Sequence, residues 1–162
     1  MSQTSRNYMS QTSRKKTRKF LLQKLYARTY GELDEIRFQE AFFDGILDFT
    51  LDEPYVKEMF PLVIEHQNDI LGIIKKYAPK FDVDTMLKTN ILALSIAITE
   101  MLWLPEEIPA KVSINEAIDL AKYYGDDTSK NIVNGILNSF FLHIKSHSDT
   151  NEITQEKYHF FT

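Results

Sequence analysis

The amino-acid sequence predicts an all-α protein of about six or seven helices. Apolar residues recur at spacings of three and four, as they do along one face of a helix. No segment shows the sustained alternation of apolar and polar residues that is typical of a half-buried strand. The chain has 162 residues, of which 43% are hydrophobic and 12% aromatic, enough apolar surface for the core of a single domain.

The first helix is expected to begin at about Ser13, with Leu21 and Leu25 on its apolar face, and to end at Gly31. Basic residues crowd its first turns, where the helix dipole disfavours cations, so the pattern suggests an external anion as partner. Residues 1–13 are small, polar and basic and cannot bury enough apolar surface to order themselves. We expect a disordered basic leader there.

Two further helices are expected before the middle of the chain. The second, over 33–49, has an acidic entrance and phenylalanines that we assign to the core. After a turn, the third carries apolar residues from Val63 to Ile74, with Pro61 at or near its first turn and Pro79 at its end.

The segment 91–98 is apolar on almost every side, which predicts a central helix surrounded by the others. Asp82 or Asp84 is expected to cap its start. Glu100, near its end, is either a buried general acid or an acceptor for backbone N–H groups of the linker 103–108. We favour the structural interpretation.

The last two helices are expected to meet at a tight corner. Pro109 suits a first helical turn, and Ser113 with Glu116 fits the Ser-x-x-Glu capping box. Gly125 is expected to end that helix, and the side-chain oxygens of residues 126–129 can accept hydrogen bonds from the first N–H groups of the next.

The expected domain organisation is a leader, one domain and a tail. Residues 14–144 are expected to form a single domain. Residues 145–162 are expected to be a flexible tail, unless Tyr158, Phe160 and Phe161 dock back onto the body.

Several classes of function have no support in the sequence. Cysteine is absent, which excludes disulfides, thiolate metal sites and a cysteine nucleophile. No apolar run reaches membrane-spanning length, so a cytoplasmic protein with no membrane association is the default. No phosphate-binding glycine loop or catalytic set stands out, so we expect no enzyme and no cofactor. His143 and His147 lack a third ligand nearby, and we interpret them as a surface pair rather than a metal site.

The charge is unevenly distributed along the chain. Residues 1–30 contain eight lysines and arginines and no acidic residue, whereas the remainder contains eleven basic and 23 acidic residues. A basic arm on an acidic body is typical of a protein that binds a polyanion. A solvated helix face that complements its own acidic body is the alternative. We favour a role in binding nucleic acid.

Four motifs together carry a resemblance to a known family. They are R-K-K-T-R-K-F-L-L-Q-K-L-Y (14–26), E-M-L followed by proline (100–105), I-P-A-K-V-S-I-N-E-A-I-D-L-A-K-Y-Y-G (108–125) and S-K-N-I-V-N-G-I-L (129–137). Over residues 14–141 the chain resembles the NusB family of bacterial transcription antitermination factors. The resemblance implies a NusB-like fold of two packed helical subdomains, no enzymatic activity and binding to boxA RNA jointly with NusE, a small-subunit ribosomal protein. That complex would join the antitermination machinery on RNA polymerase, chiefly during ribosomal RNA synthesis.

The resemblance also implies which residues bind RNA. The arginine-rich motif of the family falls on Arg14, Lys15, Lys16, Arg18 and Lys19, which would neutralise phosphates. Tyr26 takes the aromatic position next to the RNA and would stack on an unpaired base, with a core tyrosine as the alternative.

A second RNA-facing patch is implied at the corner between the last two helices. Its residues are Asp127, Thr128, Ser129, Lys130 and Asn131. The chain departs from the family here, because Thr128 replaces an aspartate and Asn131 with Ile132 replaces Lys-Phe, which removes an aromatic for base stacking. For the surface that contacts NusE, the candidates are Lys88, Thr89 and Asn90.

Two other functions remain open from the sequence. A NusB-like domain also occurs ahead of an RNA methyltransferase as an RNA-binding accessory, and this chain, which ends without the catalytic domain, could be a fragment of such an enzyme. The other possibility is a homodimeric protein-interaction module, for which the basic residues would be dispensable.

Overall fold

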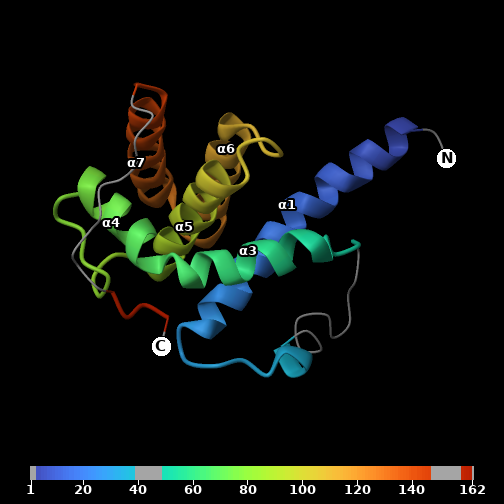
Figure 1. Cartoon of the computed structure of the whole chain (residues 1–162), viewed down its shortest axis with the longest axis horizontal. Helices are drawn as coiled ribbons and strands as arrows, with labels where there is room; N and C mark the ends of the chain where they lie inside the picture. The colour runs from blue at the N-terminus through green and yellow to red at the C-terminus, as the bar shows by residue number, and fades with distance from the viewer. Residues whose placement is uncertain (1–2, 39–48, 147–157, 162) are drawn as a thin grey trace.

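The computed structural model describes the backbone of residues 3–38, 49–146 and 158–161, with side chains from Arg14 onward (Figure 1). Within these ranges the chain is helical and contains no strand, which confirms the all-α prediction. The helices are α1 (Gln3–Arg28), α3 (Glu53–Glu65), α4 (Gln67–Tyr77), α5 (Lys88–Trp103), α6 (Ala110–Tyr124) and α7 (Asp127–Ser146). Residues 35–38 are also helical, residues 33, 34 and 49 are not, and residues 39–48 of the second predicted helix lie outside the described residues.

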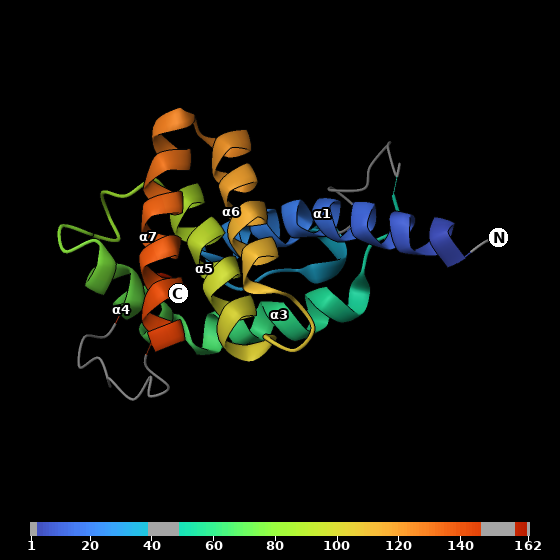
Figure 2. The same cartoon turned by 90° about the horizontal axis from the view of Figure 1, so that it is seen from above.

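Helix α5 is the centre of the fold, as its apolar sequence predicts. Every residue from Asn90 to Met101 is buried, and α5 contacts α1, α3, α4, α6 and α7 (Figures 1 and 2). A helix that is apolar all round is stable only when neighbours cover each face. The other helices therefore take their positions from α5.

Helix α1 begins at Gln3, ahead of the start near Ser13 that the sequence predicts. Its C-terminal part packs on the body through buried side chains that include Leu21, Leu22 and Leu25. Its N-terminal part extends away from the other helices in both views (Figures 1 and 2). The expected division into leader, domain and tail remains a prediction.

The single helix predicted around Pro61 is in fact two helices. Asp52 caps α3 by accepting a hydrogen bond from the Tyr55 N–H (3.3 Å), and Pro54 lies in the first turn, where a missing N–H costs nothing. Pro61 therefore lies inside α3 rather than at its start. The chain turns at His66 before α4 begins.

The predicted cap of the central helix is also wrong. Helix α5 follows Leu87 and has no side-chain cap. Asp82 instead accepts the Asp84 N–H at 2.8 Å within the preceding turn, so its carboxylate is used before α5 starts.

The corner between α6 and α7 forms as predicted. Gly125 follows the last residue of α6, and the Asp126 carboxylate accepts the Ser129 N–H at 3.0 Å in the first turn of α7. A Cβ at Gly125 would lie 2.5 Å from Ser129 Oγ and 2.8 Å from the Ala121 carbonyl oxygen. Glycine is therefore required here by close packing.

The end of the chain docks onto α4, which was the alternative to a free tail. The Tyr158 N–H donates to Asn68 Oδ1 (2.7 Å), and the Phe161 N–H donates to Gln67 Oε1 (3.1 Å). Phe160 and Phe161 are buried. Residues 147–157 lie outside the described residues.

Candidate nucleic-acid interface

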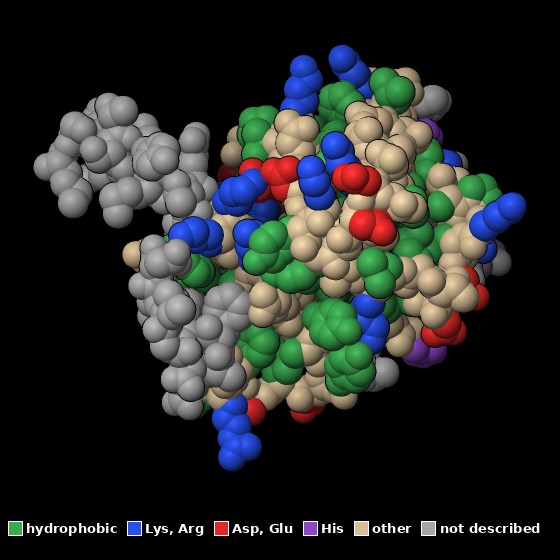
Figure 3. Space-filling model, turned by 180° about the vertical axis from the view of Figure 1, so that it is seen from behind, with side chains coloured by type: hydrophobic (Ala, Val, Ile, Leu, Met, Phe, Trp, Pro, Cys, Tyr) green, Lys and Arg blue, Asp and Glu red, His purple; other side chains and the backbone are tan. Residues whose placement is uncertain are grey.

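The first cations in the described side chains of α1 are held by acidic residues of other segments. Arg14 pairs with Asp52 before α3 (2.7 Å), and Lys15 Nζ lies 2.8 Å from Asp119 and 3.4 Å from Glu116 on α6. Hydrogen bonding to Asp119 is the largest cause that raises the pKa of Lys15, with the nearby carboxylate charges adding to it. Figure 3 shows basic and acidic side chains lying directly beside each other on one face of the molecule.

Two further lysines of the arginine-rich motif contact aromatic rings. Lys19 Nζ lies 3.8 Å from the centre of the Tyr123 ring, and Lys16 Nζ lies 5.6 Å from that of Phe49. A cation–π contact near the surface is worth only about 0.5–1 kcal/mol, so the contact with Tyr123 does not by itself keep Lys19 from a phosphate.

Arg18 is not part of this surface, although the sequence groups it with the others. Its side chain is buried, with the whole residue 3% exposed, and forms two hydrogen bonds with Glu100 on α5. Nε lies 2.9 Å from Oε2 and Nη2 lies 3.1 Å from Oε1. A phosphate cannot reach a guanidinium in this position, so Arg18 has a structural role.

Glu100 is the acceptor at the junction of four helices. Besides Arg18 of α1, it accepts hydrogen bonds from the hydroxyls of Tyr55 on α3 and Ser113 on α6 (2.8 Å). The predicted capping box is therefore wrong, because α6 begins at Ala110 and Ser113 turns inward. Glu100 is structural as favoured, but its partners are side chains from far along the chain rather than the linker N–H groups.

Two groups of this junction, Arg18 and Tyr55, have a raised pKa. Burial acts to lower the pKa of Arg18, but the hydrogen bonds and negative charge of Glu100 outweigh it and raise that pKa. Burial and then the charge of Glu100 raise the pKa of Tyr55 well above its usual range. At neutral pH Arg18 is therefore a guanidinium cation and the Tyr55 hydroxyl is neutral.

A second surface feature lies where α1 ends and α5 starts. Tyr26 is 37% exposed, which excludes the alternative of a core tyrosine, and its ring centre lies 5.9 Å from that of Tyr30. Lys88 Nζ lies 5.4 Å from the centre of the Tyr26 ring and 4.2 Å from that of Tyr30. The sequence reasoning missed Tyr30, because a single tyrosine after a helix carries no signal of its exposure.

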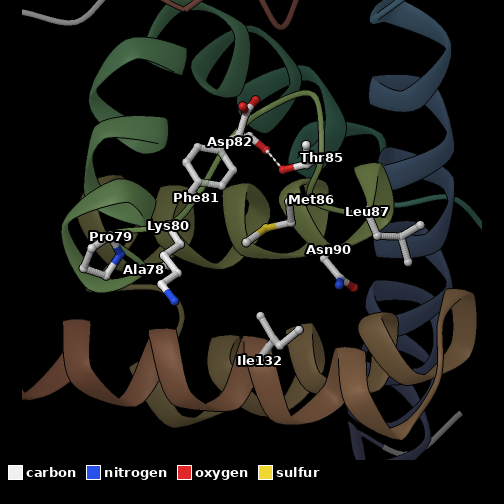
Figure 4. A pocket seen from close by; sticks show the side chains of 10 residues that line it. All are labelled: Ala78, Pro79, Lys80, Phe81, Asp82, Thr85, Met86, Leu87, Asn90 and Ile132. Carbon is white, nitrogen blue, oxygen red and sulfur yellow. Dashed lines mark hydrogen bonds between the residues drawn. The ribbon is translucent and has the colours of Figure 1, made fainter.

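Of the other two partner candidates, Thr89 is partly buried and Asn90 is buried. Asn90 lines a pocket of about 640 Å³ between the α4–α5 connection and Ile132 of α7 (Figure 4). The buried atoms Thr89 Oγ1 and Asn90 Oδ1 have no hydrogen-bond partner among the described residues.

The residues expected at the corner are not equally accessible. Asp127, Thr128, Lys130 and Asn131 are exposed at the start of α7. Ser129 is buried against Gly125 and belongs to the packing of the corner.

Metal-binding and membrane-spanning features are absent from the described part of the chain. Within it, no group of three or more histidines and acidic residues is placed to hold a metal ion. None of the helices described is long and apolar enough to cross a membrane. His143 packs edge-on against Tyr77, while His147 lies outside the described residues.

Comparison with known proteins gives matches over most of the chain. The model of the NusB family matches residues 15–141. The transcription antitermination protein NusB of Bacillus subtilis (strain 168) is 33% identical over 108 residues, which cover 67% of this chain and 81% of the relative. The NusB protein of Clostridium perfringens (strain SM101 / Type A) is 31% identical over 135 residues, 82% of this chain and 99% of the relative.

Two solved structures share the fold. One, described as the crystal structure of a plectonemic RNA supercoil, matches with a TM-score of 0.69 and 24% identity over 83% of this chain and 99% of that chain. The other is a crystal structure of the antitermination factors NusB and NusE in complex with dsRNA. It matches with a TM-score of 0.67 and 23% identity over 84% of this chain and 98% of that chain. The likeness confirms the NusB-like helical architecture.

Proposed function

Because the chain belongs to the NusB family of transcription antitermination proteins, we propose that it binds boxA-type single-stranded RNA together with NusE. In this role it is an adaptor within the antitermination complex on RNA polymerase and supports ribosomal RNA transcription. We further propose that it acts in the cytoplasm, without catalytic chemistry or a cofactor.

The observation that carries the proposal is the row of accessible cations on α1, formed by Arg14, Lys15, Lys16 and Lys19. The carboxylate partners of Lys15 do not prevent phosphate binding, since exposed ion pairs are worth only about 0–1 kcal/mol. Lys15 keeps a side chain that is 46% exposed while it contacts Asp119. A phosphate chain that meets several cations at once also gains from the release of counterions.

The exposed residues Asp127, Thr128, Lys130 and Asn131 supply the second RNA contact in this proposal. With no aromatic at Ile132, this contact acts through hydrogen bonds and the charge of Lys130 rather than through stacking. The NusB and NusE structure in complex with dsRNA has the same fold and supports an RNA-facing role.

For the NusE surface we propose the start of α5 at Thr89 and Asn90 together with the adjacent pocket. An apolar side chain of a partner would fill the space beside Met86, Leu87 and Ile132.

A titration of fluorescent boxA-type RNA tests the proposal, with and without added NusE. We expect binding that weakens as salt is raised and tightens when NusE is present. An absence of RNA binding at low salt with NusE present would refute it. A Thr85→Trp variant should lose the tightening by NusE and keep the binding to RNA alone, because Thr85 is exposed at the pocket and the new ring blocks the pocket without changing a charge.

A further inference from the structure

The end of α1 is tied to the start of α5 in a way that presents two aromatic rings to solvent. Lys88 Nζ donates to Thr29 Oγ1 (3.1 Å), and the Thr29 hydroxyl donates to the Tyr26 carbonyl oxygen (2.6 Å). These bonds fix the turn that follows α1. The backbone that carries Tyr26 and Tyr30 is therefore held in place before any ligand arrives.

The two rings are accessible and do not cover each other. Tyr30 is 72% exposed, about twice the exposure of Tyr26, and contributes nothing to the core. The planes of the two rings are inclined by 53°, so they are not stacked face to face. Exposed and preorganised aromatic rings are the feature on which proteins stack unpaired bases.

The charge beside the rings favours a nucleic acid over an apolar protein segment. Lys88 is hydrogen-bonded to a neutral hydroxyl, and among the described residues no carboxylate lies within salt-bridge distance of its Nζ. Lys15 and Arg14, by contrast, must first release their carboxylates. A phosphate can therefore meet Lys88 without displacing a competing anion.

The two phenol groups also act as a pair. Their mutual hydrogen bond raises the pKa of Tyr26 and lowers that of Tyr30, and the positive charge of Lys88 lowers the pKa of Tyr30 further. The cation thus acts electrostatically on the ring next to it. This supports a cluster in which the ammonium group and both rings meet the same ligand.

We propose that Tyr26 and Tyr30 stack on two neighbouring unpaired bases of RNA and that Lys88 binds the phosphate of one of those nucleotides. The site extends the RNA path from the basic face of α1, around the end of that helix, to the first turn of α5. It rests on the proposed RNA-binding function and adds Tyr30 and Lys88 to it, which moves Lys88 from the protein-partner surface to the RNA surface.

The test measures RNA alone, without NusE, so that a protein-docking role is kept apart. Binding of boxA-type RNA is followed by fluorescence anisotropy for wild type, Tyr30→Ala and Tyr30→Phe. The alanine variant should bind about tenfold more weakly, since one stacked base is lost, whereas the phenylalanine variant keeps the ring and should bind like wild type. Leu142→Ala, which removes a similarly accessible apolar side chain on α7, is the matched control.

Two further readouts report on the mechanism. RNA with 2-aminopurine placed at successive positions should show one position whose fluorescence is quenched by wild type and Tyr30→Phe but not by Tyr30→Ala. Lys88→Gln should reduce the slope of log affinity against log salt by about 0.7, the value for one phosphate contact of a single strand.

The outcomes separate this inference from the proposed function. If wild type binds the RNA and Tyr30→Ala binds equally well, the stacking site is refuted while RNA binding stands. The site is equally refuted if Tyr30→Ala weakens only the binding of NusE, because the rings then face a protein. If wild type binds no RNA at all, the proposed function itself fails.

Discussion

Removal of the Glu100 carboxylate tests how the junction of α1, α3, α5 and α6 is held. In Glu100→Ala the Arg18 guanidinium stays buried with only Glu116, 4.0 Å from Nη1, as a counter-charge, and the hydroxyls of Tyr55 and Ser113 lose their acceptor. Breaking a buried ion pair from one side costs about 3–5 kcal/mol. Each unsatisfied hydroxyl adds about 1–3 kcal/mol before relaxation and water entry reduce the sum.

We therefore expect Glu100→Ala to lose about 4–6 kcal/mol of unfolding free energy. Domains of this kind have about 5–15 kcal/mol in total, so the variant should be largely unfolded at modest urea concentrations. The conservative variant Glu100→Gln keeps the shape and loses the charge, and it should cost about 3 kcal/mol. Urea unfolding followed by circular dichroism measures both values.

A double variant provides the control. The double variant Arg18→Met with Glu100→Leu leaves neither charge of the ion pair buried. It should therefore be more stable than the single variant Glu100→Leu by at least about 2 kcal/mol. Two results would contradict the coupling of Arg18 with Glu100. One is a loss of less than about 1 kcal/mol of unfolding free energy in Glu100→Gln, and the other is a double variant whose loss equals the sum of the losses of the two single variants.

Three other predictions concern the corner, the competing acids and high pH. Gly125→Ala should lower the free energy of unfolding by about 1–3 kcal/mol, because the new Cβ would overlap Ser129 and displace the start of α7. Unchanged stability in thermal unfolding would contradict the required close packing. Asp119→Asn should bind RNA several-fold more tightly at low salt, since Lys15 no longer has this competitor; weaker or equal binding would argue against phosphate contact at Lys15. Tyr55 has a raised pKa in the folded state, so as pH rises the unfolded state loses the Tyr55 proton first, at about pH 10. The free energy of unfolding should therefore fall above that pH for as long as the folded state keeps the proton. Tyr55→Phe should show a smaller fall in urea titrations at pH 9 and 11, and an identical fall would contradict the assignment.

The features predicted correctly from the sequence depend on signals that are short-range or repeated. The apolar run of α5 predicts a helix covered on all sides, because no other environment suits it. Gly125 and Asp126 predict the corner, since a helix end and a helix start each need specific residues within one turn.

The errors arise where a distant partner outcompetes a local motif, or where two local signals compete. Ser113 fits a capping box, but its hydroxyl is used by Glu100, which is 13 residues away. Arg18 looks like its basic neighbours, and only the fold shows that Glu100, 82 residues away, pairs with it in the interior. Pro61 resembles the first-turn proline of a helix. The helix α3 nevertheless begins earlier, after its cap Asp52, in a segment whose composition suggests a turn. Residue type alone does not carry this information.

The central claim is that accessible cations of α1 bind RNA phosphates while Arg18 holds the fold. The salt dependence of binding to boxA-type RNA in the presence of NusE tests it most directly. Lys15→Gln with Lys16→Gln should lower the slope of log affinity against log salt by about 0.7 for each phosphate that the variant no longer binds, with helicity unchanged. The control Lys76→Gln with Lys145→Gln, at the ends of α4 and α7, should keep the wild-type slope. Equal slopes for the two double variants would contradict the claim.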